Sequence, residues 1–168
     1  MQNCELLQAK TKLIVDISDA KLSNDPSNML VTYSLGSCIG VTFYDSATNT
    51  GAMLHYQLPS ASLDPERAKK SPFMFADTGI DMIVNKLKSL GVNVKQLKIK
   101  VAGGANMQTG PQGFDIGKRN YLAVRKILWQ HGMFMDGEDV GGGAPRNLYL
   151  DLADGAVRMR SGNIEKAL

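Results

Sequence analysis

The chain has 168 residues, of which 43% are hydrophobic and 21% charged, and its net charge is +3. This composition is typical of a globular protein with one hydrophobic core, and it excludes the low hydrophobicity and high charge of a disordered chain. Since no run of lysine and arginine exceeds two residues, the charge also argues against nucleic acid or an anionic membrane as a partner.

The sequence carries no sign of export or membrane insertion. No stretch approaches the ~20 apolar residues of a membrane helix, and the start, MQNCELLQAKTK, lacks the apolar core and cleavage site of a secretory signal. We therefore expect a cytoplasmic protein, with a flexible N-terminus over 1–11 and a single domain over 12–168. A disulfide between Cys4 and Cys38 is poorly motivated in such a chain.

The first half of the chain reads as strands. Apolar and β-branched runs predict strands over 12–17, 29–35, 39–45 and 51–58, a loop over 18–28, and a long polar loop with three prolines over 59–73. In the second half, helical spacing predicts helices from about 77 to 90 and from 118 to 131, with Tyr121 facing inward. The remaining predicted strands are 96–103, a short one over 133–135, 147–152 and 156–160.

These elements add up to about eight short strands and two main helices. Because hairpins link most of the strands, we expect an α+β fold with largely antiparallel strands and the helices covering one face.

One hairpin brings a cysteine and a histidine together. Two apolar sets must share one of its faces: Ile39, Val41 and Phe43 on the first strand, and Ala52, Leu54, Tyr56 and Leu58 on the second. Cys38 and His55 then share the other face. With a loop over 45–48 they lie directly opposite one another, and with a loop over 45–50 they lie one diagonal step apart. Either register separates their Cβ atoms by roughly 5–8 Å.

A thiol beside an imidazole suggests nucleophilic catalysis. A neighbouring imidazolium would lower the pKa of Cys38 and stabilise its thiolate. We expect Gly36 to allow a sharp turn and Gly40 to leave open space above the sulfur, while backbone N–H groups at the turn hold an oxyanion. The alternative is a plain core cysteine and an unrelated histidine.

Other motifs fit less well. Gly36-Ser37-Cys38-Ile39-Gly40 matches a nucleophile elbow, but IGVTFYD after the cysteine is a poor helix. The segment before Gly117-Lys118 lacks the spacing of a P-loop. The clusters VAGGAN and VGGGAP are better read as tight turns and close backbone approaches than as a dinucleotide site. The cysteines and histidines lack the spacing of a zinc site, so we expect no metal and no cofactor.

The motifs taken together resemble the CheD family of chemoreceptor glutamine deamidases. The segments that carry this resemblance are LVTYSLGSCIGVTFYD, GAMLHYQLP, FADT, KVAGGANM, DIGKRN and DVGGGAPRNLYLDLADGAV, in this order along the chain. The resemblance implies a three-layer α/β/β sandwich, similar to the catalytic domain of the cytotoxic necrotizing factor toxins. It also implies a catalytic set of Cys38, His55 and Thr32.

The chemistry implied by the resemblance is conversion of receptor glutamine to glutamate with release of ammonia; some members also hydrolyse receptor methyl esters. The Cys38 thiolate would attack the carboxamide, and the backbone at Gly36 and Ser37 would support the oxyanion. His55 would protonate the leaving ammonia and then activate water. Thr32 would orient His55 through its side chain or its main-chain carbonyl; the sequence leaves both open.

The implied partners are the cytoplasmic helices of chemoreceptors and a CheC-type phosphatase of phosphorylated CheY. An alternative function is that of a mainly non-catalytic regulator, which binds and activates this phosphatase. Rapid alkylation of Cys38 near neutral pH would favour the enzyme, and slow alkylation would favour the regulator.

Overall fold

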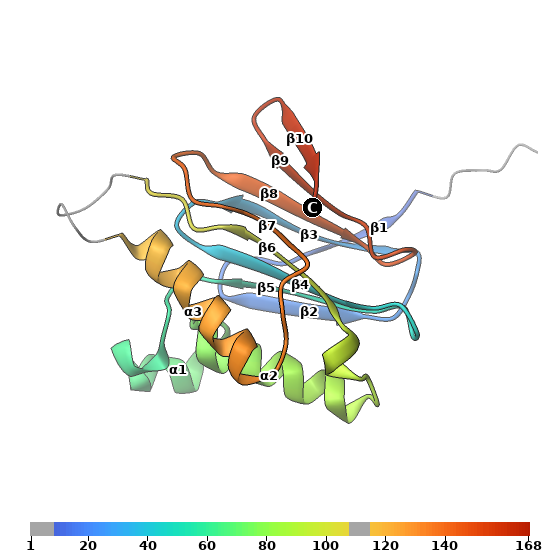
Figure 1. The fold of residues 1–168 in the computed structure, drawn as a ribbon, viewed down its shortest axis with the longest axis horizontal. Helices are drawn as coiled ribbons and strands as arrows, with labels where there is room; N and C mark the ends of the chain where they lie inside the picture. The colour runs from blue at the N-terminus through green and yellow to red at the C-terminus, as the bar shows by residue number, and fades with distance from the viewer. Residues whose placement is uncertain (1–8, 108–114) are drawn as a thin grey trace, which may run out of the picture.

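The computed structural model describes residues 9–107 and 115–168, which form two stacked sheets and a layer of helices (Figure 1). The expected flexible N-terminus, residues 1–11, lies mostly outside the described residues, as does Cys4. Ten strands are present in the described ranges: β1 Thr11–Ile14, β2 Asp19–Ser23, β3 Asn28–Leu35, β4 Ile39–Asp45, β5 Thr50–Tyr56, β6 Lys98–Gly103, β7 Gly137–Val140, β8 Arg146–Asp151, β9 Val157–Ser161 and β10 Ile164–Ala167.

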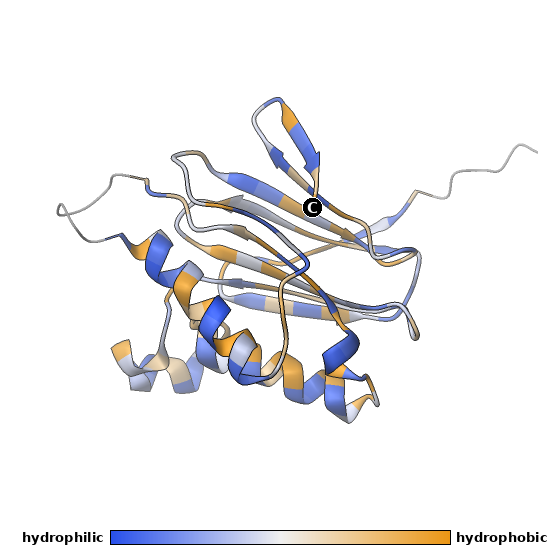
Figure 2. Cartoon of the chain, in the orientation of Figure 1, coloured by the Kyte–Doolittle hydropathy of each residue, from blue (hydrophilic) through white to orange (hydrophobic). Residues whose placement is uncertain are grey.

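The helices are α1 Pro65–Lys70, α2 Ala76–Ser89 and α3 Ile116–Gln130, with single 3-10 turns at Ala61–Leu63, Pro72–Met74 and Val94–Gln96. All three α-helices lie on the same side of the sheets (Figure 1). In Figure 2, α2 and α3 carry hydrophobic and hydrophilic bands in alternation, as helices with one buried face do. No helix of the described ranges combines the length and hydrophobicity that crossing a bilayer requires.

The strands form two five-stranded sheets. The central sheet has the order β2-β5-β4-β6-β7, and the outer sheet has the order β1-β3-β8-β9-β10. Only two neighbouring pairs, β1–β3 and β6–β7, run parallel among the described strands. The helices cover one face of the central sheet and the outer sheet covers its other face (Figure 1). The expected α+β fold, with three layers and largely antiparallel strands, is confirmed.

The alternation in the β4–β5 hairpin explains why the central sheet is buried on both faces. The predicted apolar set points to the helix layer, where Val41, Phe43 and Leu54 join the core built on α2 and α3. The opposite set points to the outer sheet, where Met53 and Cys38 pack with Leu148. His55 and Cys38 therefore belong to the seam between the two sheets.

Several elements differ from the sequence prediction. Residues 19–23, expected in a loop, form the edge strand β2, because β5 offers an open edge for pairing. The short strand expected over 133–135 lies instead at β7, next to β6. The 59–73 loop contains α1, which begins with Asp64 accepting a hydrogen bond from the Arg67 N–H. The strand β10 had no counterpart in the prediction.

Candidate active site

The register of the β4–β5 hairpin places Cys38 and His55 on one face. Gly40 is the partner of His55 and Ile39 is the partner of Tyr56. Cys38 therefore lies one diagonal step from His55, which is the second of the two registers that the sequence allowed. The cysteine is half-buried and free, and the His55 side chain is buried.

Thr32 reaches His55 from the facing sheet. Its hydroxyl lies 2.7 Å from His55 Nδ1 and donates to the carbonyl of Val15, also at 2.7 Å. A hydroxyl has one proton. Since Val15 takes that proton, Thr32 Oγ1 must accept from the imidazole, so His55 carries its hydrogen on Nδ1. The contact is made by the Thr32 side chain, which was one of the two options that the sequence left open.

The other imidazole nitrogen has no partner. His55 Nε2 is buried and makes no hydrogen bond within the described part of the chain. Leaving such an acceptor unpaired costs about 1–3 kcal/mol. This nitrogen is therefore available to accept a proton, and Cys38 lies on the same face of the hairpin without a hydrogen bond to it.

Burial shifts both titrating groups toward their neutral forms. Loss of solvent lowers the pKa of His55 from 6.5 to about 4, although the negative charges of Asp16 and Asp19 pull it upward. Burial also raises the pKa of the Cys38 thiol, opposed by a hydrogen bond from its own backbone N–H. The expected lowering of the Cys38 pKa is therefore wrong, because burial acts on the thiol in the opposite direction.

The space above Gly40 shows what excludes water from this part of the seam. A Cβ built at Gly40 would lie 2.9 Å from Leu35 Cδ1 and 3.0 Å from Leu148 Cδ2. The space above Gly40 is thus filled by leucines of the outer sheet, and the expectation of open space above the sulfur is wrong. The chain bends over residues 36–38, as expected for a turn before Cys38, and the residue with a left-handed backbone nearby is Ser34, with φ 57°.

Three hydrogen bonds fix the peptide planes of the loop formed by Gly36, Ser37 and Cys38, here called the nucleophile loop. The carbonyls of Gly36 and Cys38 accept from the N–H groups of Ala105 at 2.8 Å and Gly104 at 2.9 Å. The carbonyl of Ser37 accepts from Asn120 Nδ2 at 2.9 Å.

The C=O and the following N–H of a trans peptide point in opposite directions. The N–H groups of Ser37 and Cys38 are therefore turned away from 104–105 and Asn120. The N–H groups of Ser37 and Cys38 are thus the ones left to face an oxyanion, and the expected support by Gly36 and Ser37 stays a prediction.

The glycine clusters serve close packing against this loop. A Cβ at Gly103 would lie 2.2 Å from the carbonyl oxygen of Cys38, and one at Gly117 would lie 2.4 Å from the carbonyl oxygen of Ala105. Only glycine allows these approaches. The preferred interpretation of VAGGAN as a close backbone approach is confirmed, and β4 after Cys38 excludes the strand–turn–helix of a nucleophile elbow.

Sequence reasoning did not identify Asn120 as part of the site. It expected Tyr121 on the inner face of the helix, but Asn120 is fully buried and Tyr121 only partly. The available signal was its spacing, since Asn120 falls in line with the buried Gly117 and Val124. A polar residue on a buried stripe needs hydrogen-bond partners, and partners of this kind are often functional.

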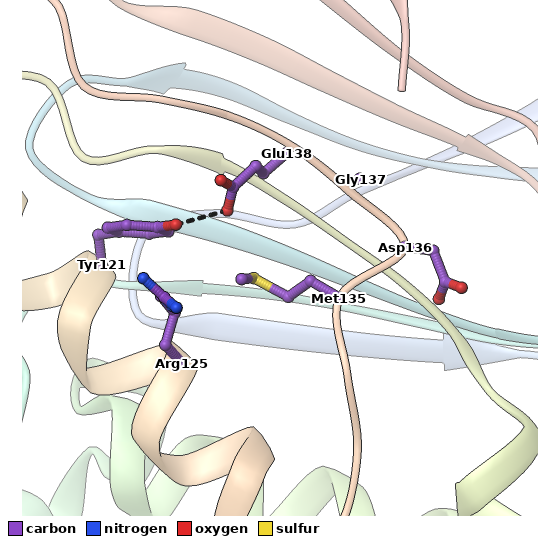
Figure 3. Close-up of a pocket in the computed structure, with 6 residues that line it drawn as sticks. All are labelled: Tyr121, Arg125, Met135, Asp136, Gly137 and Glu138. Carbon is purple, nitrogen blue, oxygen red and sulfur yellow. Dashed lines mark hydrogen bonds between the residues drawn. The ribbon is translucent and has the colours of Figure 1, made fainter.

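A pocket between α3 and β7 lies outside this constellation (Figure 3). Tyr121 donates a 2.7 Å hydrogen bond to Glu138 there, and the Arg125 guanidinium lies 5.7 Å from the Tyr121 ring centre. None of Cys38, His55 and Thr32 lines it. Residues 9–107 and 115–168 also hold no cluster of His, Cys, Asp and Glu that could bind a metal ion.

The chain is similar to a known protein family and to named relatives that span nearly its whole length. The family described as "CheD chemotactic sensory transduction" matches residues 57–161. A "Probable chemoreceptor glutamine deamidase CheD" of Solibacter usitatus is 43% identical over 157 residues, covering 94% of this chain and 93% of the relative. A second such protein, "CheD 1" of Syntrophus aciditrophicus, is 43% identical over 149 residues, covering 89% and 93%.

Among solved structures, the Bacillus licheniformis hypothetical protein YfiH is similar with a TM-score of 0.48 and 11% identity, over 72% of this chain and 50% of that one.

Proposed function

The chain belongs to the CheD family, and we propose that it is a cysteine-dependent deamidase that converts glutamine side chains of chemoreceptors to glutamate and releases ammonia. The names of its relatives support the substrate and the reaction. The observation that carries the mechanism concerns His55, which lies on the face of Cys38. Its Nδ1 contacts Thr32, and its Nε2 is buried and unpaired among the described residues.

In the first half of the reaction Cys38 is acylated. The thiol gives its proton to His55 Nε2 as the sulfur attacks the carboxamide carbon, and the oxyanion that forms takes hydrogen bonds from the N–H groups of Ser37 and Cys38. The imidazolium then donates this proton to the departing nitrogen, which leaves as ammonia. A thioester between Cys38 and the receptor side chain remains.

In the second half, water replaces the sulfur. Nε2 of His55, again unprotonated, accepts a proton from water as the water oxygen attacks the thioester carbon. The proton passes to the leaving sulfur, which restores the thiol and releases glutamate. Throughout both halves, the Nδ1–H of His55 donates to Thr32. Asp16 and Asp19 favour the transient imidazolium by their charge.

The raised pKa of the Cys38 thiol changes which experiment can distinguish an enzyme from a regulator. Because burial raises the pKa of the Cys38 thiol, slow alkylation at neutral pH is expected of the enzyme too. The alkylation rate therefore no longer separates the two functions, whereas the mass of the receptor does.

The test is mass spectrometry of receptor fragments incubated with the wild type, Cys38→Ala and Cys4→Ala. We expect the wild type and Cys4→Ala to add about one dalton for each glutamine converted, and Cys38→Ala to add none while remaining folded. Cys4→Ala is the matched control, because it removes the other thiol of the chain. Conversion by Cys38→Ala at the wild-type rate would refute the mechanism.

Three finer proposals rest on the family resemblance. The same thioester chemistry would hydrolyse receptor methyl esters, with methanol leaving in place of ammonia. Since the receptor segments concerned lie in the cytoplasm, we place the enzyme there too.

We also propose a CheC-type phosphatase as a partner, whose binding should survive Cys38→Ala because binding does not need the thiol. If this variant instead supported normal receptor signalling in cells, the regulator would be the better interpretation.

A further inference from the structure

Asn120 connects the helix layer with both halves of the candidate site. Its Nδ2 donates to the carbonyl of Ser37 at 2.9 Å and to the carbonyl of Gln57 at 2.7 Å. Ser37 precedes Cys38, and Gln57 lies two residues after His55 in the chain. One side-chain amide therefore links the loop that carries the sulfur to the segment that follows the histidine strand.

The position of this amide is itself fixed. Asn120 is fully buried, and its own backbone carbonyl accepts a 2.6 Å hydrogen bond from the hydroxyl of Tyr56 on β5. Reversing the amide would aim Oδ1 at two carbonyl oxygens, so the orientation with Nδ2 toward Ser37 and Gln57 is the only favourable one. The two N–H bonds of Nδ2 match the two carbonyls.

The bond to Ser37 also orients the next peptide group. Because the Ser37 carbonyl points to Asn120, the N–H of Cys38 points away from it. This N–H is one of the two groups that the proposed mechanism aims at the oxyanion. Asn120 thus acts on the sulfur-bearing residue through its backbone, and at the same time sets its separation from the segment after His55.

We propose that Asn120 is a positioning residue for deamidation, which holds the nucleophile loop and the end of β5 at the separation that Cys38 and His55 need to act together. This proposal rests on the proposed function. Small displacements of a reacting group cost about 100-fold in rate. Loss of Asn120 should therefore lower kcat by about this factor and change KM little, because Asn120 touches no substrate.

The first test compares Asn120→Ala with Val124→Ala. Val124 is fully buried one turn later on α3, so its truncation loosens the same helix without removing a hydrogen bond to the loop. At a temperature where both variants are folded, we expect kcat to fall about 100-fold in Asn120→Ala and to stay within about twofold in Val124→Ala. Equal effects in the two variants would overturn the proposal.

The second test uses Asn120→Asp, which has nearly the same shape. Its carboxylate repels the two carbonyls, whereas the protonated form can donate one hydrogen bond. The ratio of its kcat to that of the wild type should rise as the pH falls, measured where both proteins are folded. A ratio that does not change with pH would show that hydrogen-bond donation by this side chain does not matter.

Alkylation of Cys38 separates failure of this proposal from failure of the proposed function. If the wild type modified no receptor, the deamidase proposal would fall. The hold of Asn120 on the nucleophile loop could still be measured, through the rate at which Cys38 is alkylated. Releasing the nucleophile loop exposes the sulfur and relieves the burial that raises its pKa. Asn120→Ala should then react faster with iodoacetamide than Val124→Ala does, and equal rates would refute the link.

Discussion

A single hydroxyl proton determines the chemistry of the candidate site. Thr32 gives its proton to Val15 and therefore receives one from His55. This leaves the lone pair of His55 on Nε2, which is buried and has no hydrogen-bond partner in the described ranges. If Thr32 could not accept, the imidazole would be free to place its hydrogen on Nε2, where it could not serve as a base.

Replacement of Thr32 tests this role. Thr32→Val keeps the shape but removes the acceptor, so we expect kcat/KM to fall by about 10- to 100-fold. Thr32→Ser keeps the hydroxyl and should retain most of the activity, because it can donate and accept as threonine does. Equal losses in the two variants, measured by receptor deamidation, would mean that the methyl group and not the hydroxyl matters.

The sequence was sufficient to place Cys38 and His55 on one face, because strand alternation is a local property. It could not choose between two registers, since the loop length decides that. The direction of the Cys38 pKa could not be predicted either. It depends on burial in the seam between the sheets, where one of the two leucines above Gly40, Leu148 of the outer sheet, lies more than a hundred residues away in sequence.

At the scale of elements, a bulge in β3 turns both Thr32 and Leu35, the residue before the nucleophile loop, into the seam between the sheets. Thr32 pairs with Leu148 and Leu35 pairs with Arg146, so two residues of β3 face one of β8. Without this extra residue, Thr32 and Leu35 would point to opposite sides of the sheet, since they are three positions apart. Both are in fact buried.

The contact of α3 with the segment that follows β6 predicts a contrast between two helical glycines. A methyl group on Gly117 would meet backbone oxygens, at 2.4 Å from Ala105. One on Gly79 would meet the Leu54 side chain at 3.1 Å and the Cα of Phe73 at an ordinary contact distance of 3.6 Å. Gly117→Ala should therefore destabilise the protein by roughly 2 kcal/mol or more and reduce activity. Gly79→Ala should be near neutral, because alanine gains about 1 kcal/mol of helix propensity.

Urea unfolding of the two glycine variants measures this contrast. If Gly117→Ala proved as stable as Gly79→Ala, α3 could withdraw from the segment after β6 at no cost. The close packing of α3 on residues 104–105 would then not hold the nucleophile loop in place.

The helices and most strands followed from periodicity, but the edge strands β2 and β7 did not. Each has only one partner within its sheet, so it needs no continuous apolar run. β2 is rich in polar residues, with Asp19 and Lys21 forming a 2.6 Å ion pair, and resembles a loop. β7 forms beside β6 in parallel, and such a long-range pairing leaves little trace in the local sequence.

At the scale of the whole molecule, polar contacts between the described residues join the two sheets. They include the buried contact between Thr32 and His55. A second is the part-buried ion pair between Arg146 on β8 and Asp139 on β7, at 2.6 Å. Burial would raise the pKa of Asp139, but hydrogen bonds from Arg146 and Lys166 outweigh it and lower that pKa. Arg146 also donates to the carbonyl of Gly141 at 2.7 Å, so it holds the glycine-rich turn before β8.

Removal of this second contact should destabilise the sandwich as a whole. We expect Arg146→Met to lower the free energy of unfolding by about 2 kcal/mol, because it leaves a partly buried carboxylate with Lys166 as its remaining ion-pair partner. Arg158→Met is the control, since Arg158 and Glu165 are both about half exposed and such pairs contribute about 0–1 kcal/mol. Urea denaturation should separate the two variants, and similar midpoints would argue against a tie between the sheets.

The most direct test of the proposed role of His55 as a base is a nitrogen-15 NMR titration of its ring in the free protein. We predict a neutral ring at pH 7, with the proton on Nδ1 and none on Nε2, which becomes charged only at a pH of about 4. The kcat/KM for deamidation should stay level as the pH falls from 7 and then decline through the same value, because the base is lost when Nε2 is protonated. An imidazolium at pH 7, or a neutral ring with its proton on Nε2, would contradict the mechanism.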